Sequence, residues 1–248
     1  MLIETGNFSS AAAIKHNASR LKTKLFNPKA YRKITNLRNK VPTDLDHISV
    51  RPFLENECIF LHVPKCGGLS IAKSLFKCRA GAHIAISGYK QIFTYAEFSR
   101  FFKFTFVRNP WDRLVSAYFF LKDGGIAETD ADMARNSVDL YPGFEAFVMN
   151  YVAHEDVSQI LHFRPQCSFI CPDGNRLSEI DFLGRFERIG EDFDLICQRL
   201  DIPNTLKKRN AGKTRPKAYQ DLYTEPMKKV VARVYARDIE LLQYSFDG

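Results

Sequence analysis

The chain has 248 residues, of which 45% are hydrophobic and 26% are charged, and its formal net charge is +8. This composition is typical of a soluble globular protein, and no apolar run approaches membrane-spanning length, so stable membrane insertion is not expected. The length allows one α/β domain with an appendage. The positive charge favours an anionic ligand or surface.

Residues 1–55 are predicted to form a basic N-terminal arm, followed by a globular domain over residues 56–248. The arm shows little hydrophobic periodicity and is expected to be extended or partly helical. Its basic block, like a second one over residues 207–217, is either a solvated surface or an anion-binding one. No zinc-finger, RNP or helix-turn-helix motif accompanies them, so no nucleic-acid partner is expected. The first block contains Lys15, Arg20, Lys22, Lys24, Lys29, Arg32, Lys33, Arg38 and Lys40.

A short apolar run over residues 59–63 predicts a buried strand, and a small amphipathic helix is expected after Gly68. Between them, Gly67 and Gly68 permit positive φ and the close approach of a ligand, and Ser70 stands where a helix N-terminus is capped. The N–H groups of the helix start and the ammonium of Lys65 would together attract one phosphate or sulfate group. The loop is not a standard P-loop, because Lys65 precedes the glycines.

A second buried strand is predicted over residues 104–107, and it ends at Arg108. The next helix, over residues 111–120, is expected to pack Trp111 against the core, whereas Arg113 is expected to reach either phosphate or solvent. The arrangement of strand, loop and helix therefore occurs twice. Strands that alternate with helices indicate a parallel sheet covered on both faces, with ligands at the carboxyl ends of the strands.

The rest of the chain is predicted to complete the core. Residues 122–141 are rich in Gly, Ala, Asp and Glu, which is typical of a mobile loop that acts as a lid. The six cysteines are scattered, which predicts buried, reduced side chains and no zinc site. The further expected elements are a helix from Pro142, short strands over 168–170 and 180–186 around a turn at 172–174, a helix over 191–200, and a closing helix capped by Thr224.

The two loops together resemble the nucleotide-binding motifs of a known family. The segments His62-Val-Pro-Lys-Cys-Gly-Gly-Leu-Ser70 and Phe106-Val-Arg-Asn-Pro-Trp-Asp-Arg-Leu-Val-Ser-Ala-Tyr118 are similar to those of the carbohydrate sulfotransferases that use 3′-phosphoadenosine 5′-phosphosulfate. The likeness extends from about Cys58 to Phe246. It implies an α/β, three-layer, P-loop-like fold with a central parallel sheet flanked by helices, and it makes residues 56–248 a sulfotransferase domain.

The resemblance also implies how the donor is bound. Arg108 and Ser116 would hold the 3′-phosphate, and an arginine fork with a nearby hydroxyl suits a dianionic phosphate. Lys65 would stabilise the bridging oxygen as 3′-phosphoadenosine 5′-phosphate leaves, and no metal is expected. Relatives often carry a threonine where this chain has Leu69, so that position offers only its backbone N–H. The loop that would hold the 5′-phosphosulfate consists of Lys65, Cys66, Gly67, Gly68, Leu69 and Ser70.

Transfer to a hydroxyl also needs a general base, and histidine is the natural choice near neutral pH. His83 lies between the two loops, where related sulfotransferases tend to keep a base, and is predicted to take this role. His162 is the alternative. It belongs to a segment that resembles the acceptor-side stretch of the family, so Arg164 and Gln166 are expected to contact sugar.

The late basic segment, residues 207–217, matches a loop that folds over the nucleotide in relatives. Lys213 or Arg215 would then add a contact to phosphate. The other interpretation is that the segment is only a run of charged side chains exposed to solvent. The expected acceptor is an oligo- or polysaccharide that the sequence does not identify further. The best-known animal Golgi members carry a membrane anchor and luminal disulfides, so their absence here favours a cytoplasmic, bacterial-type enzyme. The luminal domain of a truncated Golgi-type enzyme is the alternative.

Two other functions remain open at this point. A P-loop-type kinase or other nucleotide-binding protein would show a lysine after the glycines and an acidic metal ligand at a strand end, where this chain has Arg108. A non-catalytic protein that binds an anionic polymer would rely on the basic blocks. Its affinity would fall steeply with salt, and it would ignore the sulfate donor.

Overall fold

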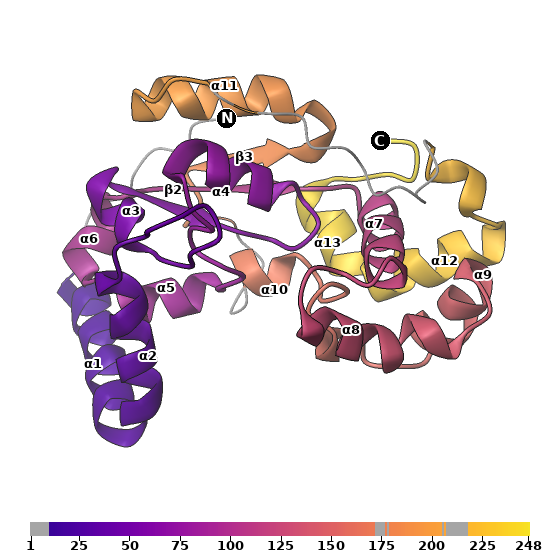
Figure 1. Ribbon diagram of the computed structural model, residues 1–248, viewed down its shortest axis with the longest axis horizontal. Helices are drawn as coiled ribbons and strands as arrows, with labels where there is room; N and C mark the ends of the chain where they lie inside the picture. The colour runs from indigo at the N-terminus through magenta and orange to yellow at the C-terminus, as the bar shows by residue number, and fades with distance from the viewer. Residues whose placement is uncertain (1–9, 172–176, 178, 205, 207–217) are drawn as a thin grey trace. The chain divides into compact units, whose positions relative to one another are not determined.

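The computed structural model describes residues 10–171, 177, 179–204, 206 and 218–248 (Figure 1). The chain forms two compact units. The first comprises Met1–Val63, Gly67–Phe106 and Ser168–Lys207, and the second comprises Pro64–Cys66, Val107–Cys167 and Lys208–Gly248. The first loop of the predicted donor site therefore passes from one unit to the other within its own sequence.

A sheet of three strands forms the centre of the first unit, in the order β1-β2-β3. Strands β1 (Cys58–Leu61) and β2 (Phe102–Val107) pair in parallel, with Cys58 opposite Phe102. All four residues of β1 are buried, as the apolar run predicts. Strand β3 (Phe182–Arg185) needs a glycine at Gly184, because a Cβ atom there would lie 2.6 Å from the Phe106 ring. The predicted α/β fold with a parallel sheet and flanking helices is confirmed (Figure 1).

The first unit contains both long and short helices. The best-capped one is α6, where Thr94 and Glu97 form a capping box that satisfies the first N–H groups. These helices are α1 (Ser10–Phe26), α2 (Pro28–Asn39), α3 (Arg51–Glu55), α4 (Gly68–Phe76), α5 (Ile86–Ile92), α6 (Tyr95–Arg100) and α11 (Ile189–Leu200).

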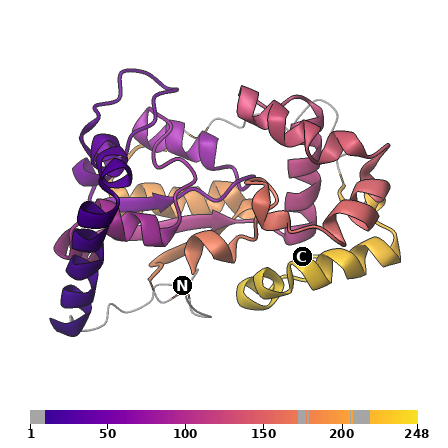
Figure 2. The ribbon, with the colours of Figure 1, turned by 90° about the horizontal axis from the view of Figure 1, so that it is seen from below.

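The predicted arm contains α1, α2 and the short helix α3, and of these α1 and α2 lie side by side and contact α5 (Figures 1 and 2). Arg38 of α2 donates two hydrogen bonds to the carboxylate of Glu97 in α6, at 2.8 and 2.5 Å. This pair connects the hairpin of α1 and α2 to the remainder of the first unit.

The second unit is helical, and its core forms where α7, η2 and α12 pack through side chains such as Leu114, Val148 and Val231. Helix α7 begins well because Asn109 caps it and Pro110 fills its first position. The elements are α7 (Pro110–Lys122), α8 (Glu128–Arg135), η1 (Val138–Leu140), α9 (Phe144–Ala146), the π-helical turn η2 (Phe147–Val152), η3 (Val157–Gln159), η5 (Gln220–Leu222), α12 (Glu225–Val234) and α13 (Ala236–Leu242).

Three expectations for these elements were wrong. Residues 122–141 are not a loop, because α8 and η1 form within them. Residues 168–170 belong to the short helix α10 (Cys167–Ile170) and not to a strand. The closing helix is interrupted at Tyr235, which separates α12 from α13, and no hydrogen bond from the Thr224 side chain caps its start.

Other expectations hold or fall outside the described part of the chain. All six cysteines are buried and unbridged, as predicted. The turn at 172–174 lies outside the described residues. Among the described residues, no helix combines the length and the hydrophobicity that crossing a bilayer requires.

Candidate functional site

The turn before α4 has the backbone that its glycines predict. Gly67, the residue at the N-cap, has a φ of +80°, and Lys65 also adopts positive φ. A Cβ atom on Gly68 would lie 2.0 Å from the His62 ring, so this position excludes every larger residue. Ser70 is inside α4 and does not cap it, which corrects the sequence interpretation. Within the described residues no side chain caps α4, and N–H groups at such a helix start are able to bind an anion.

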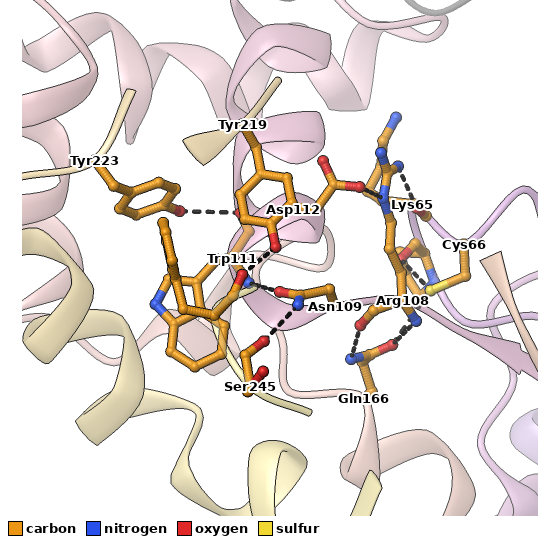
Figure 3. A network of polar contacts seen from close by, with 12 residues as sticks. Lys65, Cys66, Arg108, Asn109, Trp111, Asp112, Gln166, Tyr219, Tyr223 and Ser245 are labelled. Atoms are coloured by element: carbon orange, nitrogen blue, oxygen red, sulfur yellow. Dashed lines mark hydrogen bonds and ion pairs between the residues drawn. The ribbon is translucent and has the colours of Figure 1, made fainter. Parts of the chain in front are cut away.

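The side chain and the backbone of Lys65 make different contacts. The ammonium lies 3.5 Å from the centroid of the Phe120 ring, close enough for a cation–π interaction. The carbonyl of the same residue accepts a hydrogen bond from Nη1 of Arg108 at 3.0 Å. The first predicted loop thus meets the second through Lys65 (Figure 3).

Arg108 follows β2 directly and is only 2% exposed. Its Nε donates to Oδ2 of Asp112, one turn into α7, at 2.6 Å. A short charge-assisted bond of this kind fixes the guanidinium plane. The ion pair of Arg108 and Asp112 is buried, and a further hydrogen bond holds Arg108 beside Lys65 (Figure 3).

Gln166 joins the two loops and is fully buried. Its Oε1 accepts hydrogen bonds from the Arg108 N–H at 2.9 Å and from the Cys66 thiol at 3.3 Å, and its Nε2 donates to the Arg108 carbonyl at 2.8 Å. Asp238 in turn accepts hydrogen bonds from the backbone N–H groups of Gln166 and Cys167. The expectation that Gln166 contacts sugar is wrong, because the side chain is engaged inside the protein (Figure 3).

Arg113, like Arg108, is a buried cation. It is 1% exposed, and its guanidinium donates to the carbonyls of His162 at 3.2 Å and Arg164 at 2.8 Å. This burial contradicts the expectation that Arg113 reaches solvent, whereas a contact with phosphate stays a prediction. Its bonds connect α7 to the segment that carries His162.

The start of α7 is also fixed from the C-terminal part of the chain. Asn109 accepts a hydrogen bond from the Trp111 N–H and donates one to the carbonyl of Ser245 at 2.7 Å. The hydroxyl of Tyr223 donates to the carbonyl of Trp111 at 3.0 Å (Figure 3). Trp111 is 5% exposed, which confirms that it packs against the core. Ser116, the other predicted phosphate ligand, is partly exposed further along α7.

His83 belongs to the first unit, where its Nδ1 lies 2.9 Å from the carbonyl oxygen of His62. A carbonyl only accepts hydrogen bonds, so Nδ1 carries the proton of the neutral ring and Nε2 carries the lone pair. The ring of His62 is 4.3 Å from that of His83 and packs beside Gly68. His62 thus connects His83 to the start of α4.

His162, the alternative base, is in a different environment. It is 6% exposed, and its Nε2 donates to Oδ1 of Asp130 in α8 at 2.9 Å. Burial lowers the pKa of His162, and the positive charge of Lys65 lowers it further. The hydrogen bond to Asp130 acts in the opposite direction and raises this pKa. The pair of His162 and Asp130 connects α8 to the segment that carries His162. Lys213 and Arg215 lie outside the described residues.

The match to a protein-family model agrees with this arrangement. The model of the sulfotransferase family matches residues 53–245, which is most of the chain. No curated protein and no solved structure gives a significant match. The matched range contains both strand-end loops, His83 and the Gln166 network that joins the loops. The chain therefore belongs to the sulfotransferase family.

Proposed function

We propose that this sulfotransferase moves the sulfuryl group of 3′-phosphoadenosine 5′-phosphosulfate to a hydroxyl of a carbohydrate acceptor. The identity of the donor follows from the family. The choice of a carbohydrate as acceptor follows from the resemblance of both loops to those of carbohydrate sulfotransferases. The observation that carries the proposal is the contact between the loops, in which Arg108 bonds to the Lys65 carbonyl and Gln166 bonds to both Cys66 and Arg108.

The residues of this site have the chemistry that the donor requires. The donor carries a 3′-phosphate and a 5′-phosphosulfate, both anionic. Arg108 offers a fixed guanidinium, and the uncapped start of α4 offers N–H groups with the positive end of a helix dipole. Arg108 and Ser116 are proposed to hold the 3′-phosphate, and Lys65 to Ser70 the 5′-phosphosulfate.

Lys65 is proposed to stabilise the charge that develops on the bridging oxygen. Its ammonium is held over the Phe120 ring, which limits its motion without neutralising its charge. A charge that is positioned before the reaction stabilises the transition state more than a mobile one does. Sulfuryl transfer, like phosphoryl transfer, depends mainly on such positioning.

His83 is proposed to accept the proton of the acceptor hydroxyl at Nε2. The bond between Nδ1 and the His62 carbonyl sets the required tautomer before the acceptor binds. As the acceptor oxygen bonds to sulfur and loses its proton, the bond from sulfur to the nucleotide oxygen breaks. His162 is less suited to this role, because it is buried and bonded to Asp130.

The test is transfer from donor labelled in the sulfuryl group, in the presence of chelator. The acceptors are neutral oligosaccharides, a glycosaminoglycan, a simple phenol and a tyrosine-containing peptide. The proposal predicts labelled sugar and no labelled phenol or peptide. Labelling of the phenol or peptide alone would contradict the carbohydrate assignment, and labelling that requires added Mg²⁺ would contradict the mechanism.

A further inference from the structure

Helix α1 exposes a row of apolar side chains to solvent. Ala11, Ile14, Ala18, Leu21 and Leu25 follow one another at spacings of three and four residues, which places them on one helical face. All five are exposed, and the exposed fractions of Ile14, Leu21 and Leu25 are 69%, 56% and 64%. We call these five residues the α1 stripe.

The opposite face of α1 contacts the rest of the first unit through polar side chains, which include His16, Arg20 and Thr23. His16 bonds to the carbonyl of Phe93, and Arg20 donates to the carbonyl of Gln91 at 3.1 Å. Thr23 donates to the side chain of Gln91 at 3.0 Å. This orientation is the reverse of an ordinary surface helix, which turns its apolar face toward the core. The α1 stripe therefore needs an explanation other than packing within the first unit.

Basic residues flank the stripe. Lys15 and Lys22 lie along one side of it and Lys24 along the other, as their spacing from Ile14 and Leu21 requires. Residues 10–40 contain no aspartate or glutamate. The neighbouring helix α2 adds an open groove of 440 Å³ lined by Lys29, Arg32, Lys33, Asn36, Leu37 and Lys40.

These charges decide which partner fits the stripe. Two copies of α1 packed along it would bring lysines of both copies together, which disfavours a second copy of this chain. An acidic helix of another protein would match the stripe but would leave the basic groove on α2 unused. A surface that is apolar in depth and anionic over a wide plane matches the stripe with its flanking lysines, and the basic residues of α2 add to the positive charge of the hairpin. An anionic phospholipid membrane has these properties.

We propose that the hairpin of α1 and α2 is a docking surface for anionic phospholipid membranes, with the α1 stripe lying in the headgroup region. Leu21, Leu25 and the 79% exposed Phe26 enter the apolar boundary, while the lysines beside them meet lipid phosphates. This binding is peripheral and reversible, and no helix has to span the bilayer. The inference is independent of the proposed donor site, because none of its residues contributes to that site.

The test is co-sedimentation of the full chain with sucrose-loaded vesicles of phosphatidylcholine alone or with added phosphatidylglycerol. The decisive variant is Leu21→Gln with Leu25→Gln, which removes apolar surface without changing charge or lowering helix propensity much. Leu195→Gln is the matched control, because Leu195 is a similarly exposed leucine on α11. Circular dichroism and sulfate transfer to a soluble acceptor show that the variants fold.

We expect the chain to bind only to the anionic vesicles, and we expect this binding to weaken as the salt concentration rises. The double variant should lose affinity for these vesicles by a factor on the order of ten or more. Leu195→Gln should bind as the unchanged chain does. Equal binding to both vesicle types, no binding to either, or undiminished binding of the double variant would overturn the proposal. A dimer in sedimentation velocity that dissociates only in the double variant would also overturn it, because the stripe would then be covered by a second copy.

Discussion

The region around Gln166 buries polar side chains, whereas the outer face of α1 exposes apolar ones. In the first region Gln166, Arg108 and Asp238 are each at most 2% exposed and bond to one another or to the backbone. In the second region Ile14, Leu21 and Leu25 are each more than half exposed. Buried polar groups and exposed apolar rows are both informative, because ordinary packing produces neither.

The two regions differ in the interactions that stabilise them. Buried hydrogen bonds hold Cys66 and Arg108 of the proposed donor site in place, since breaking one would leave a buried partner without water or protein to bond to. The α1 stripe depends on no such network, and changes there should leave the fold almost intact. Variants near Gln166 should therefore change donor binding and turnover, and variants on α1 should change neither.

The largest effect is expected for His83→Ala. It should lower turnover by about a hundredfold to ten-thousandfold, because it removes the proposed general base, and leave donor affinity nearly unchanged. The acidic limb of the rate profile should disappear or shift in this variant. Leu21→Gln serves as the reference with unchanged turnover. Nearly full activity in His83→Ala together with a loss in His162→Ala would show that the base is misassigned.

Lys65→Met should lower turnover by about a hundredfold or more, and by more than its effect on donor affinity explains. Methionine keeps an unbranched side chain beside Phe120 but removes the charge and with it the cation–π interaction. Lys122→Met is the control, because Lys122 pairs with Asp139 on the surface of the same unit. An equal loss in donor affinity and in turnover would mean that Lys65 acts in binding alone.

Gln166→Ala should lower the free energy of unfolding by about 1–3 kcal/mol, because the buried N–H and carbonyl of Arg108 lose their partner. Donor affinity should fall as well, since the placement of Arg108 is loosened. Gln159→Ala is the control, because Gln159 bonds to Asp156 at the surface. Denaturant unfolding and calorimetry with 3′-phosphoadenosine 5′-phosphate check both effects. Unchanged donor affinity would remove Gln166 from the positioning of the site.

The smallest effect concerns the pair that connects α2 to α6. The hydrogen bond from Arg38 lowers the pKa of Glu97 from 4.5 to about 2, with help from Thr94. A carboxyl with a lowered pKa stabilises the fold above pH 4.5, and this contribution is lost as the pH falls toward 2. Glu97→Gln should therefore flatten the acid dependence of thermal stability in that window. An unchanged slope would show that the pair contributes no stability.

The sequence was most informative where local pattern and structure agree. Apolar runs gave the strands at Cys58–Leu61 and Phe102–Val107, and glycines gave the turn before α4. The tautomer of His83 could not be predicted, because it depends on a carbonyl that only the fold brings near. The residue types and their spacing therefore located the two loops, but they did not predict the hydrogen bonds that the loop residues make.

The errors arose where distant contacts override composition. Helix α8 is polar in composition, but Ala134 packs in the core and Asp130 bonds to the distant His162. Helix α10 has the composition of a strand, but Asp238 bonds to the N–H groups at its start. The role of Gln166 had no local signal, because its partners Cys66 and Arg108 are far away in the sequence.

The most direct test of the central claim compares two nucleotides by calorimetry in chelator: 3′-phosphoadenosine 5′-phosphate and adenosine 5′-phosphate. The unchanged chain should prefer the first, because Arg108 is proposed to bind the 3′-phosphate. Arg108→Ala should lose that preference and keep its affinity for adenosine 5′-phosphate, and Arg108→Lys should lose part of it. Arg233→Ala, at the surface of α12, should behave as the unchanged chain does. A preference that survives in Arg108→Ala would contradict the account.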